Sequence, residues 1–243
     1  MPIFENGDVH LYYEEHGEGF PILLLAPGGM RSAGPVWGKA APWNPIDQLS
    51  DDYRVIVMDQ RNAGRSTAPV RATDSWHVYT QDQLALLDHL GVERCHLAGM
   101  CIGGPFIMGI IEAAPERVAS AVVFQTIGLD EVNDNFHAFI EMFDGWAEEL
   151  KPKRPDVDDA ALESFRSNMF ERDFLFNVSR EFVSGVRTPL LVLMGNDMHH
   201  PEVCSRELAE LAPNATLIER WKAPEDQPAA KEAVEKFLAE HTS

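Results

Sequence analysis

Six consecutive residues decide the fold: Gly99-Met100-Cys101-Ile102-Gly103-Gly104. They stand between residues 94–100, an apolar run typical of a buried strand, and residues 102–114, an apolar segment of helical length. A glycine two residues before and another two residues after Cys101 lets the backbone turn sharply without a side-chain clash. Such a turn exposes Cys101 at the carboxyl end of the strand, where the following helix points its first amides. The stretch therefore predicts a strand-turn-helix elbow with Cys101 as a candidate nucleophile, the alternative being that Cys101 is a small core residue.

Strand-like and helix-like segments alternate on both sides of this elbow. Apolar runs of strand length cover residues 21–26, 53–59, 94–100, 118–125, 189–194 and 215–219, and helical patterns cover 79–89, 102–114, 201–211 and 229–240. This alternation predicts a mostly parallel α/β sheet with helices on both faces. Gly91 stands where a left-handed residue is expected to end a helix. Near the amino end, residues 9–14 alternate, and Gly17-Glu18-Gly19 predicts a hairpin turn into the run at 21–26.

Residues 128–186 interrupt the alternation. This stretch has a helical pattern throughout and no strand signal, and bulky side chains recur at three- and four-residue steps at Phe136, Phe139, Met142, Phe143 and Trp146. An inserted helical lid fits this pattern best. We therefore expect a core made of residues 1–127 and 187–243, with the lid at 128–186.

Three further motifs follow strand-like runs. Pro27-Gly28-Gly29 follows the first run, DQRNAGRS at 59–66 follows the second, and Gly195-Asn196-Asp197 follows a later one. With the elbow, this set resembles the α/β-hydrolase family over essentially the whole chain, and the elbow resembles the cysteine form found in dienelactone hydrolases. The 59–66 stretch is similar to the family's D-x-R-G-x-G-x-S segment, with Asn62 at a usual glycine position. The departure is mild because asparagine tolerates a positive φ.

The resemblance implies a set of roles. Cys101 attacks a carbonyl carbon and forms an acyl-enzyme, which water then hydrolyses. Asp197 takes the place of the triad acid. The amide of Ile102 and one amide from Gly29, or alternatively from Met30, form the oxyanion hole. The resemblance implies no cofactor, and the sequence shows no set of metal ligands.

The family's catalytic histidine is missing from its usual place after the last strand, where Arg220, Trp221 and Lys222 stand instead. Three other histidines are candidates for the base. His200 and His199 directly follow Asp197, and His77 precedes a helix that follows the 59–66 loop. We rank them in the order His200, His199, His77, which predicts Cys101, Asp197 and His200 as the catalytic residues. His96 lies inside the strand that leads to the elbow and is expected to be structural.

Composition excludes several other classes of protein. Lys and Arg number 20 and Asp and Glu number 39, so the 243-residue chain carries a net charge of −19. Such a polyanion is repelled by nucleic acids and by anionic membrane surfaces. No apolar run approaches the ~20 residues that span a bilayer, and residues 1–10 have no secretory pattern. The three cysteines, Cys95, Cys101 and Cys204, form no disulfide framework. These features predict a cytoplasmic protein.

The sequence leaves three functions open. The first is a cofactor-independent hydrolase of a small ester, thioester or lactone, whose apolar or aromatic acyl group lies in the lid pocket. The second is a small-molecule-binding homologue that has lost catalysis together with the usual histidine. The third is a cofactor-free lyase or carbon–carbon bond hydrolase that forms no acyl-enzyme. Trp37 and Trp43 fit either a pocket or the interface of a homo-oligomer.

Overall fold

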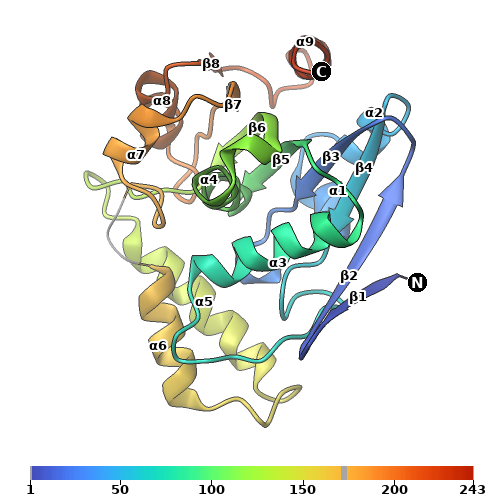
Figure 1. The fold of residues 1–243 in the computed structure, drawn as a ribbon. Helices are drawn as coiled ribbons and strands as arrows, with labels where there is room; N and C mark the ends of the chain where they lie inside the picture. Colours follow the sequence, from blue (N-terminus) through green and yellow to red (C-terminus); the bar gives the residue numbers. More distant parts are fainter. Residues whose placement is uncertain (1, 171–173, 243) are drawn as a thin grey trace.

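A computed structural model describes residues 2–170 and 174–242. The strands are β1 (Ile3–Asn6), β2 (Val9–His16), β3 (Phe20–Leu25), β4 (Tyr53–Met58), β5 (Cys95–Cys101), β6 (Val118–Thr126), β7 (Leu190–Leu193) and β8 (Ala215–Ile218). They form one eight-stranded sheet in the order β1-β2-β4-β3-β5-β6-β7-β8 (Figure 1). Strands β1 and β2 pair antiparallel, and all pairings from β4 to β8 are parallel. The predicted α/β architecture is confirmed.

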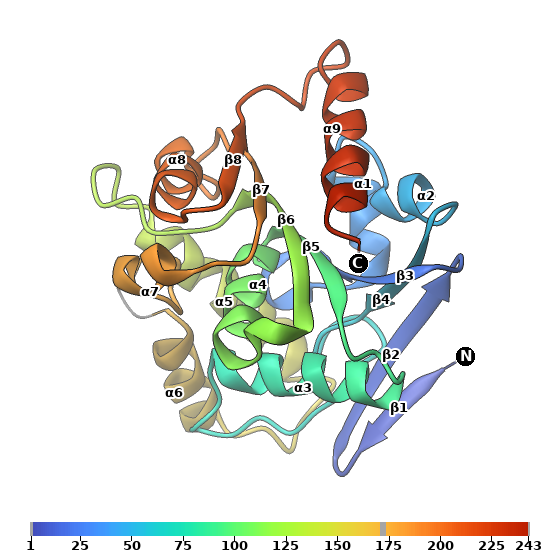
Figure 2. The same ribbon diagram turned by 45° about the horizontal axis from the view of Figure 1, so that its top comes forward.

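Helices cover both faces of the sheet, as Figure 2 shows. The α-helices are α1 (Trp37–Ala40), α2 (Pro45–Leu49), α3 (Trp76–His89), α4 (Gly103–Ala113), α5 (Phe136–Leu150), α6 (Asp159–Met169), α7 (Arg180–Gly185), α8 (Glu202–Leu211) and α9 (Gln227–Glu240); short 3-10 helices are η1 (Gly29–Arg31), η2 (Gly34–Val36) and η3 (Pro115–Arg117). Helices α3, α4 and α8 lie on one face, and α1, α2 and α9 lie on the other. Gly91, at φ 66°, ends α3 as predicted.

The predicted hairpin between residues 9–14 and 21–26 is wrong. Strand β2 pairs with β1 and β4, and β3 lies beyond β4. The reason is the geometry at Gly17, where the chain crosses the end of β4 instead of turning back on β2. A Cβ at Gly17 would lie 2.0 Å from the carbonyl oxygen of Ser50 and 2.6 Å from that of Tyr53, so only glycine permits this crossing.

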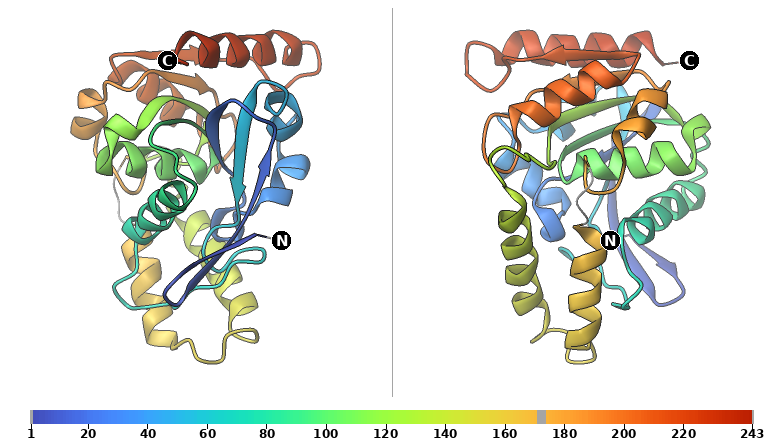
Figure 3. Two further views of the ribbon diagram at one scale, coloured as in Figure 1. Left: turned by 45° about the vertical axis from the view of Figure 1, so that its right-hand side comes forward. Right: turned by 90° about the vertical axis from the view of Figure 1, so that its left-hand side faces the viewer.

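Helices α5, α6 and α7 lie in the segment between β6 and β7. Figures 1 and 3 show α5 and α6 side by side, projecting from one end of the sheet. Their contact is aromatic, since the ring centroids of Phe143 and Phe165 are 5.3 Å apart and nearly perpendicular. The segment is less helical than predicted: Phe174 and Phe176 lie outside any helix, and Phe176 has φ 65°. Residues 171–173 of the predicted lid lie outside the described residues, and the division of the chain into core and lid stays a prediction.

The centre of the sheet is buried on both faces. Every residue of β5 and β6 is buried, as expected for parallel strands covered by helices on both sides. His96 in β5 is fully buried, and its ring nitrogens lie 2.9 Å from the hydroxyls of Ser120 and Thr242. Trp37 and Trp43 also lie inside the fold, where both contact Phe124 of β6 edge to face.

Candidate active site

Cys101 ends β5 in a strained turn. Its φ is 62°, a left-handed conformation that is rare for a residue with a side chain and recurs at functional sites. The two flanking glycines make this turn possible. A Cβ at Gly99 would lie 2.6 Å from the carbonyl oxygen of Gly103, and a Cβ at Gly103 would lie 2.6 Å from that of Leu25. The elbow predicted from the sequence is therefore present, and only 7% of Cys101 is exposed.

Two backbone amides interact with the Cys101 sulfur. One belongs to Ile102, the residue that precedes α4, and the other belongs to Gly28 in the loop after β3. Gly28 has φ 116°, a conformation that essentially only glycine adopts. The sequence pointed to Gly29 or Met30 as the second amide. In the structure the Gly28 amide lies at the sulfur, and Gly29 begins η1 with φ 59°. The assignment of Gly29 to the oxyanion hole stays a prediction.

Asp197 and His200 form a tight polar turn after β7. The backbone amide of each of these two residues donates to the carbonyl oxygen of the other. The Asp197 carboxylate also accepts from the amides of His199 and His200, and His200 Nδ1 lies 2.8 and 2.9 Å from its two oxygens. Gly195 leaves room for this turn, because a Cβ there would lie 2.2 Å from the carbonyl oxygen of His200.

The His200 ring lies close enough to the Cys101 thiol for each group to shift the pKa of the other. Because Nδ1 is bonded to Asp197, Nε2 is the nitrogen left for the sulfur. Nε2 is buried and makes no hydrogen bond of regular geometry, a looseness common in active sites without substrate. The interaction is nevertheless visible in both pKa values. Burial acts to raise the pKa of Cys101, but hydrogen bonding to His200, the charge of that ring and the two amides lower it overall.

The pKa of His200 moves in the direction that supports a thiolate. Burial acts to lower it, but the interactions with Asp197 and Cys101 raise it to about 9. The pKa of Asp197 is lowered despite partial burial, because His200 and Lys222 favour the carboxylate. The lowered pKa of Cys101 thus favours the thiolate, the raised pKa of His200 the imidazolium and the lowered pKa of Asp197 the carboxylate.

Trp221 and Lys222 occupy the region where the usual histidine is missing. The Trp221 ring is buried, and its Nε1 donates to the carbonyl oxygen of Met194 at 2.7 Å. Lys222 Nζ donates to Asn196 at 2.5 Å and stabilises the Asp197 carboxylate electrostatically. Burial lowers the pKa of Lys222, and Asp197 opposes that effect. Lys222 thus lies beside the acid on the side of the last strand, whereas His200 contacts the acid from within its own turn.

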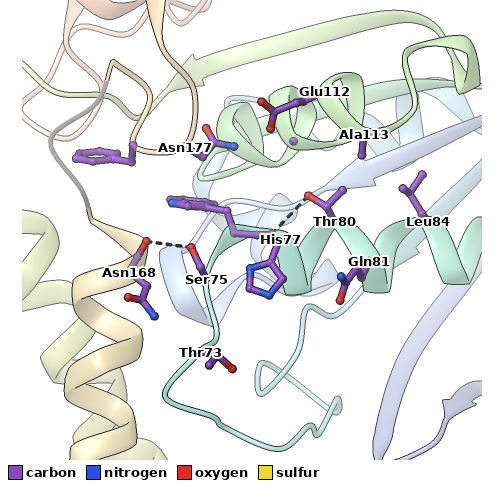
Figure 4. A pocket seen from close by; sticks show the side chains of 13 residues that line it. Thr73, Ser75, His77, Thr80, Gln81, Leu84, Glu112, Ala113, Asn168 and Asn177 are labelled. Carbon is purple, nitrogen blue, oxygen red and sulfur yellow. Dashed lines mark hydrogen bonds between the residues drawn. The ribbon is translucent and has the colours of Figure 1, made fainter. Parts of the chain in front are cut away.

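The two other candidate histidines do not share this arrangement. His199 packs its ring edge to face against Phe139 of α5, at a centroid distance of 6.0 Å. His77 is exposed on α3 and lines a surface pocket of about 580 Å³. Figure 4 shows His77 in this pocket with Thr80, Glu112 and other residues of α3 and α4. The lining of that pocket contains none of the three predicted catalytic residues.

The 59–66 loop is held by hydrogen bonds within itself and to neighbouring elements. Asp59 accepts hydrogen bonds from the backbone amides of Gly34 and Arg65, each at 2.9 Å. Arg61 is buried and forms a bidentate ion pair with Asp82 of α3. Asn62 has φ 56°, in keeping with the left-handed residue expected at this position. These contacts shape the loop and anchor it to the rest of the fold.

Cys95 and Cys204 differ from Cys101 in the direction in which their pKa is shifted. Both are buried free thiols, and burial raises the pKa of each to about 12. Thiols of this kind are unreactive at neutral pH. Within residues 2–170 and 174–242, the structure contains no cluster of three or more His, Cys, Asp or Glu side chains suited to a metal ion. In the same residues, no helix has both the length and the apolar character required to cross a membrane.

Sequence comparison places this fold in a known family. The model of the alpha/beta hydrolase fold matches residues 21–181, and the chain belongs to that family. The similar proteins include the "Putative carbamate hydrolase RutD" of Pseudomonas syringae pv. syringae, 30% identical over 224 residues that cover 82% of this chain and 84% of the relative. The RutD protein of Azorhizobium caulinodans is 40% identical over 124 residues, which cover 51% of this chain but only 43% of the relative.

Solved structures agree on the fold. A meta-cleavage product hydrolase from Pseudomonas fluorescens IP01 superposes with a TM-score of 0.71 at 24% identity, covering 96% of this chain and 95% of that one. The enol-lactonase from Burkholderia xenovorans LB400 superposes with a TM-score of 0.72 at 22% identity, covering 98% of this chain and 100% of that one. At these identities the likeness establishes the fold alone. Family membership and the curated relatives together make this chain a hydrolase of small substrates.

Proposed function

We propose that this protein hydrolyses small esters, thioesters or lactones through an acyl-enzyme on Cys101, with His200 as acid–base and Asp197 as its partner. The observation that carries the proposal is the linked set of contacts from the Asp197 carboxylate to His200 Nδ1 and from the His200 ring to the Cys101 thiol. A nucleophile, a base and a group that orients the base are the three parts that covalent acyl transfer requires.

The residues support a balanced reaction. The Cys101 thiolate attacks the carbonyl carbon, and the carbonyl π electrons move onto oxygen. When the tetrahedral intermediate collapses, the bond to the leaving group breaks and the His200 imidazolium protonates that group. The neutral ring then takes a proton from water, whose oxygen attacks the thioester. Collapse of the second intermediate releases the acid and restores the thiolate beside the imidazolium.

The oxyanion hole of this mechanism consists of the amides of Ile102 and Gly28, with Gly29 next in the same loop. Amides that face the sulfur before reaction lie close to the oxygen of a carbonyl bonded to that sulfur. Gly29 remains a candidate donor from the sequence. Cys101 also stands at the amino end of α4, whose dipole favours negative charge there.

The substrate's acyl group is proposed to be apolar or aromatic and to lie beneath α5. The inner face of α5 carries Phe139 and Phe143, both buried. Met142 covers the loop after β3, since its Cε lies 3.0 Å from the position of a Cβ on Gly29. Bidentate hydrogen bonds from Arg31 to Glu149 tie the far end of α5 to the same loop. We therefore propose that α5 acts as a lid that must shift to admit substrate.

A comparison of Cys101→Ala with the parent tests this function. A panel of an aryl ester, an acyl thioester, a lactone and an aryl carbamate covers the carbonyl classes, the last because relatives are named carbamate hydrolases. The parent is expected to hydrolyse at least one of them, and Cys101→Ala to lose that activity. Full turnover by Cys101→Ala would instead support the lyase or carbon–carbon hydrolase alternative, and saturable binding without turnover would support a binding protein.

A further inference from the structure

Asn135 connects the start of α5 to the turn that carries Asp197 and His200. Its side chain is buried, with only 3% of the residue exposed. Asn135 Nδ2 donates to the carbonyl oxygen of Gly128 at 3.0 Å and to that of Met198 at 3.1 Å, and Oδ1 accepts from the Asp130 amide at 2.9 Å. Met198 is the second residue of the 197–200 turn. One side chain thus links the end of β6, the start of α5 and the turn that bears the base.

A second contact from the same face of α5 supports this link. Phe139 is four residues after Asn135, so the two side chains lie one helical turn apart on the same side. Phe139 packs edge to face against the ring of His199, the next residue of the turn after Met198. The first turn of α5 therefore holds the 197–200 turn by a hydrogen bond to its backbone and by an aromatic contact to its side chain.

The 197–200 turn needs such support because it is exposed. Asn196, Asp197 and Met198 are all exposed, whereas the His200 ring must stay beside a buried thiol. On the opposite side, Ser205 Oγ accepts from the Gly195 amide at 3.0 Å and fixes only the start of the loop. The hydrogen bond from Asn135 reaches the middle of the turn, between the acid and the base.

We propose that Asn135 is a positioning residue that holds the Asp197–His200 turn against α5 and so keeps the imidazole beside Cys101. This inference rests on the proposed function for its catalytic meaning, although the positioning itself is a structural property. Asn135 also couples α5 to the Asp197–His200 turn, because a shift of the first turn of α5 would displace His200. Asn135 touches neither the substrate nor the reacting atoms; it acts through Met198.

The test is the titration of the His200 ring by NMR in Asn135→Ala, with Asn133→Ala as the matched control. Asn133 lies in the same loop and binds only Asp130 among its described side-chain contacts. The charges that bear on His200 are Asp197 and Cys101, with Lys222 acting on Asp197. In the parent and in Asn133→Ala we expect a pKa near 9. In Asn135→Ala we expect it to fall by about one unit or more as the ring leaves its partners.

A parent-like His200 titration in folded Asn135→Ala would overturn the inference. If Asn135→Ala does not fold, Asn135→Asp serves instead, because its carboxylate keeps the acceptor for the Asp130 amide but cannot donate to Gly128 and Met198. Because the new charge also acts on the pKa of His200, this variant is read by Cys101 acylation and not by titration. Acylation of Cys101 is measured in the same proteins and is expected to fall about 10- to 100-fold in the Asn135 variants, as for a misplaced catalytic group. Absence of acylation in the parent would refute the proposed function, while the titration would still decide the role of Asn135.

Discussion

His200 and Asp197 are three residues apart in the chain, yet the His200 ring binds both oxygens of the Asp197 carboxylate through Nδ1, at 2.8 and 2.9 Å. The acid and the proposed base therefore occupy a single turn after β7. This arrangement fits the proposal that His200 serves Cys101 in a chain that has Arg220, Trp221 and Lys222 shortly after β8.

His200→Ala is expected to slow acylation of Cys101 by roughly 10²–10⁴-fold, the usual loss when a general acid–base is removed. His199→Ala and His77→Ala are the matched controls and are expected to have much smaller effects, because neither ring contacts the thiol–acid pair. The acylation rate of Asp197→Asn is expected to lie between that of His200→Ala and those of the two controls, since the asparagine amide can orient the His200 ring but carries no charge. The measurement is the pseudo-first-order acylation rate with an activated aryl ester. Slow acylation in His77→Ala together with parent-like acylation in His200→Ala would identify His77 as the base instead.

The pH dependence of Cys101 alkylation reports on the same contacts. Because the pKa of Cys101 is lowered overall, the rate of alkylation by iodoacetamide is expected to rise with pH through a midpoint below the ~8.5 of a free thiol and then to level off. Asp197→Asn removes the charge that raises the pKa of His200, so the ring is less often the imidazolium that lowers the pKa of Cys101. The midpoint of Cys101 alkylation is therefore expected to move to higher pH in this variant. A midpoint at or above ~8.5 in the parent would show that Cys101 is an ordinary thiol.

The lid proposal predicts a size-dependent effect at Met142. Replacing Met142 by Ala removes the side chain that covers Gly29, so a bulky maleimide is expected to label Cys101 several-fold faster in Met142→Ala than in the parent. A small reagent such as iodoacetamide is expected to react at similar rates with both proteins. Equal labelling by the bulky reagent would mean that α5 does not limit access to the thiol.

The lowered pKa of the buried His96 ring leads us to expect a loss of folding stability at acidic pH. Burial, aided by the nearby positive charges of His241 and Arg94, lowers the pKa of His96 to about 4, below the ~6.5 of an unfolded histidine. The folded state thus disfavours protonation, and stability is lost as pH falls below ~6.5. The loss attributable to His96 is about 2 kcal/mol between pH 7.5 and pH 5.

Urea unfolding of the parent and of His96→Gln at these two pH values measures that contribution. The variant is expected to be less stable at pH 7.5 but to lose less on acidification. His77→Gln, which replaces an exposed histidine, is expected to keep the acid sensitivity of the parent. If His96→Gln lost as much stability between pH 7.5 and pH 5 as the parent, His96 would not be the cause of the acid sensitivity.

The sequence predicted the parts of this protein that depend on local pattern. Continuous apolar runs predicted the parallel strands. The glycines around Cys101 predicted the elbow, because a Cβ at Gly99 or Gly103 would lie only 2.6 Å from a backbone carbonyl oxygen. The proximity of Asp197 and His200 was also readable, since both stand in one short loop. In contrast, the pairing of β2 with β4 depends on a close crossing at Gly17 that no hydrophobic pattern records.

Contacts at the site between residues far apart in the chain could not be predicted from the sequence either. The Gly28 amide lies at the sulfur, and two adjacent glycines, both with positive φ, do not reveal from the sequence which amide does so. Asn135 gave no signal either, because an asparagine before a helix usually indicates a cap, whereas this side chain makes no capping bond and instead binds Met198, 63 residues away.

The most direct test of the central claim is a search for the acyl-enzyme itself. The protein is mixed with an activated aryl ester, quenched in acid within the first turnover and analysed by intact-mass and peptide mass spectrometry. We predict one added acyl group, located on the peptide that contains Cys101, more abundant when water attack is slowed and absent from Cys101→Ala. Turnover of the ester by the parent with no acyl group on Cys101, together with an equal rate in Cys101→Ala, would contradict the account.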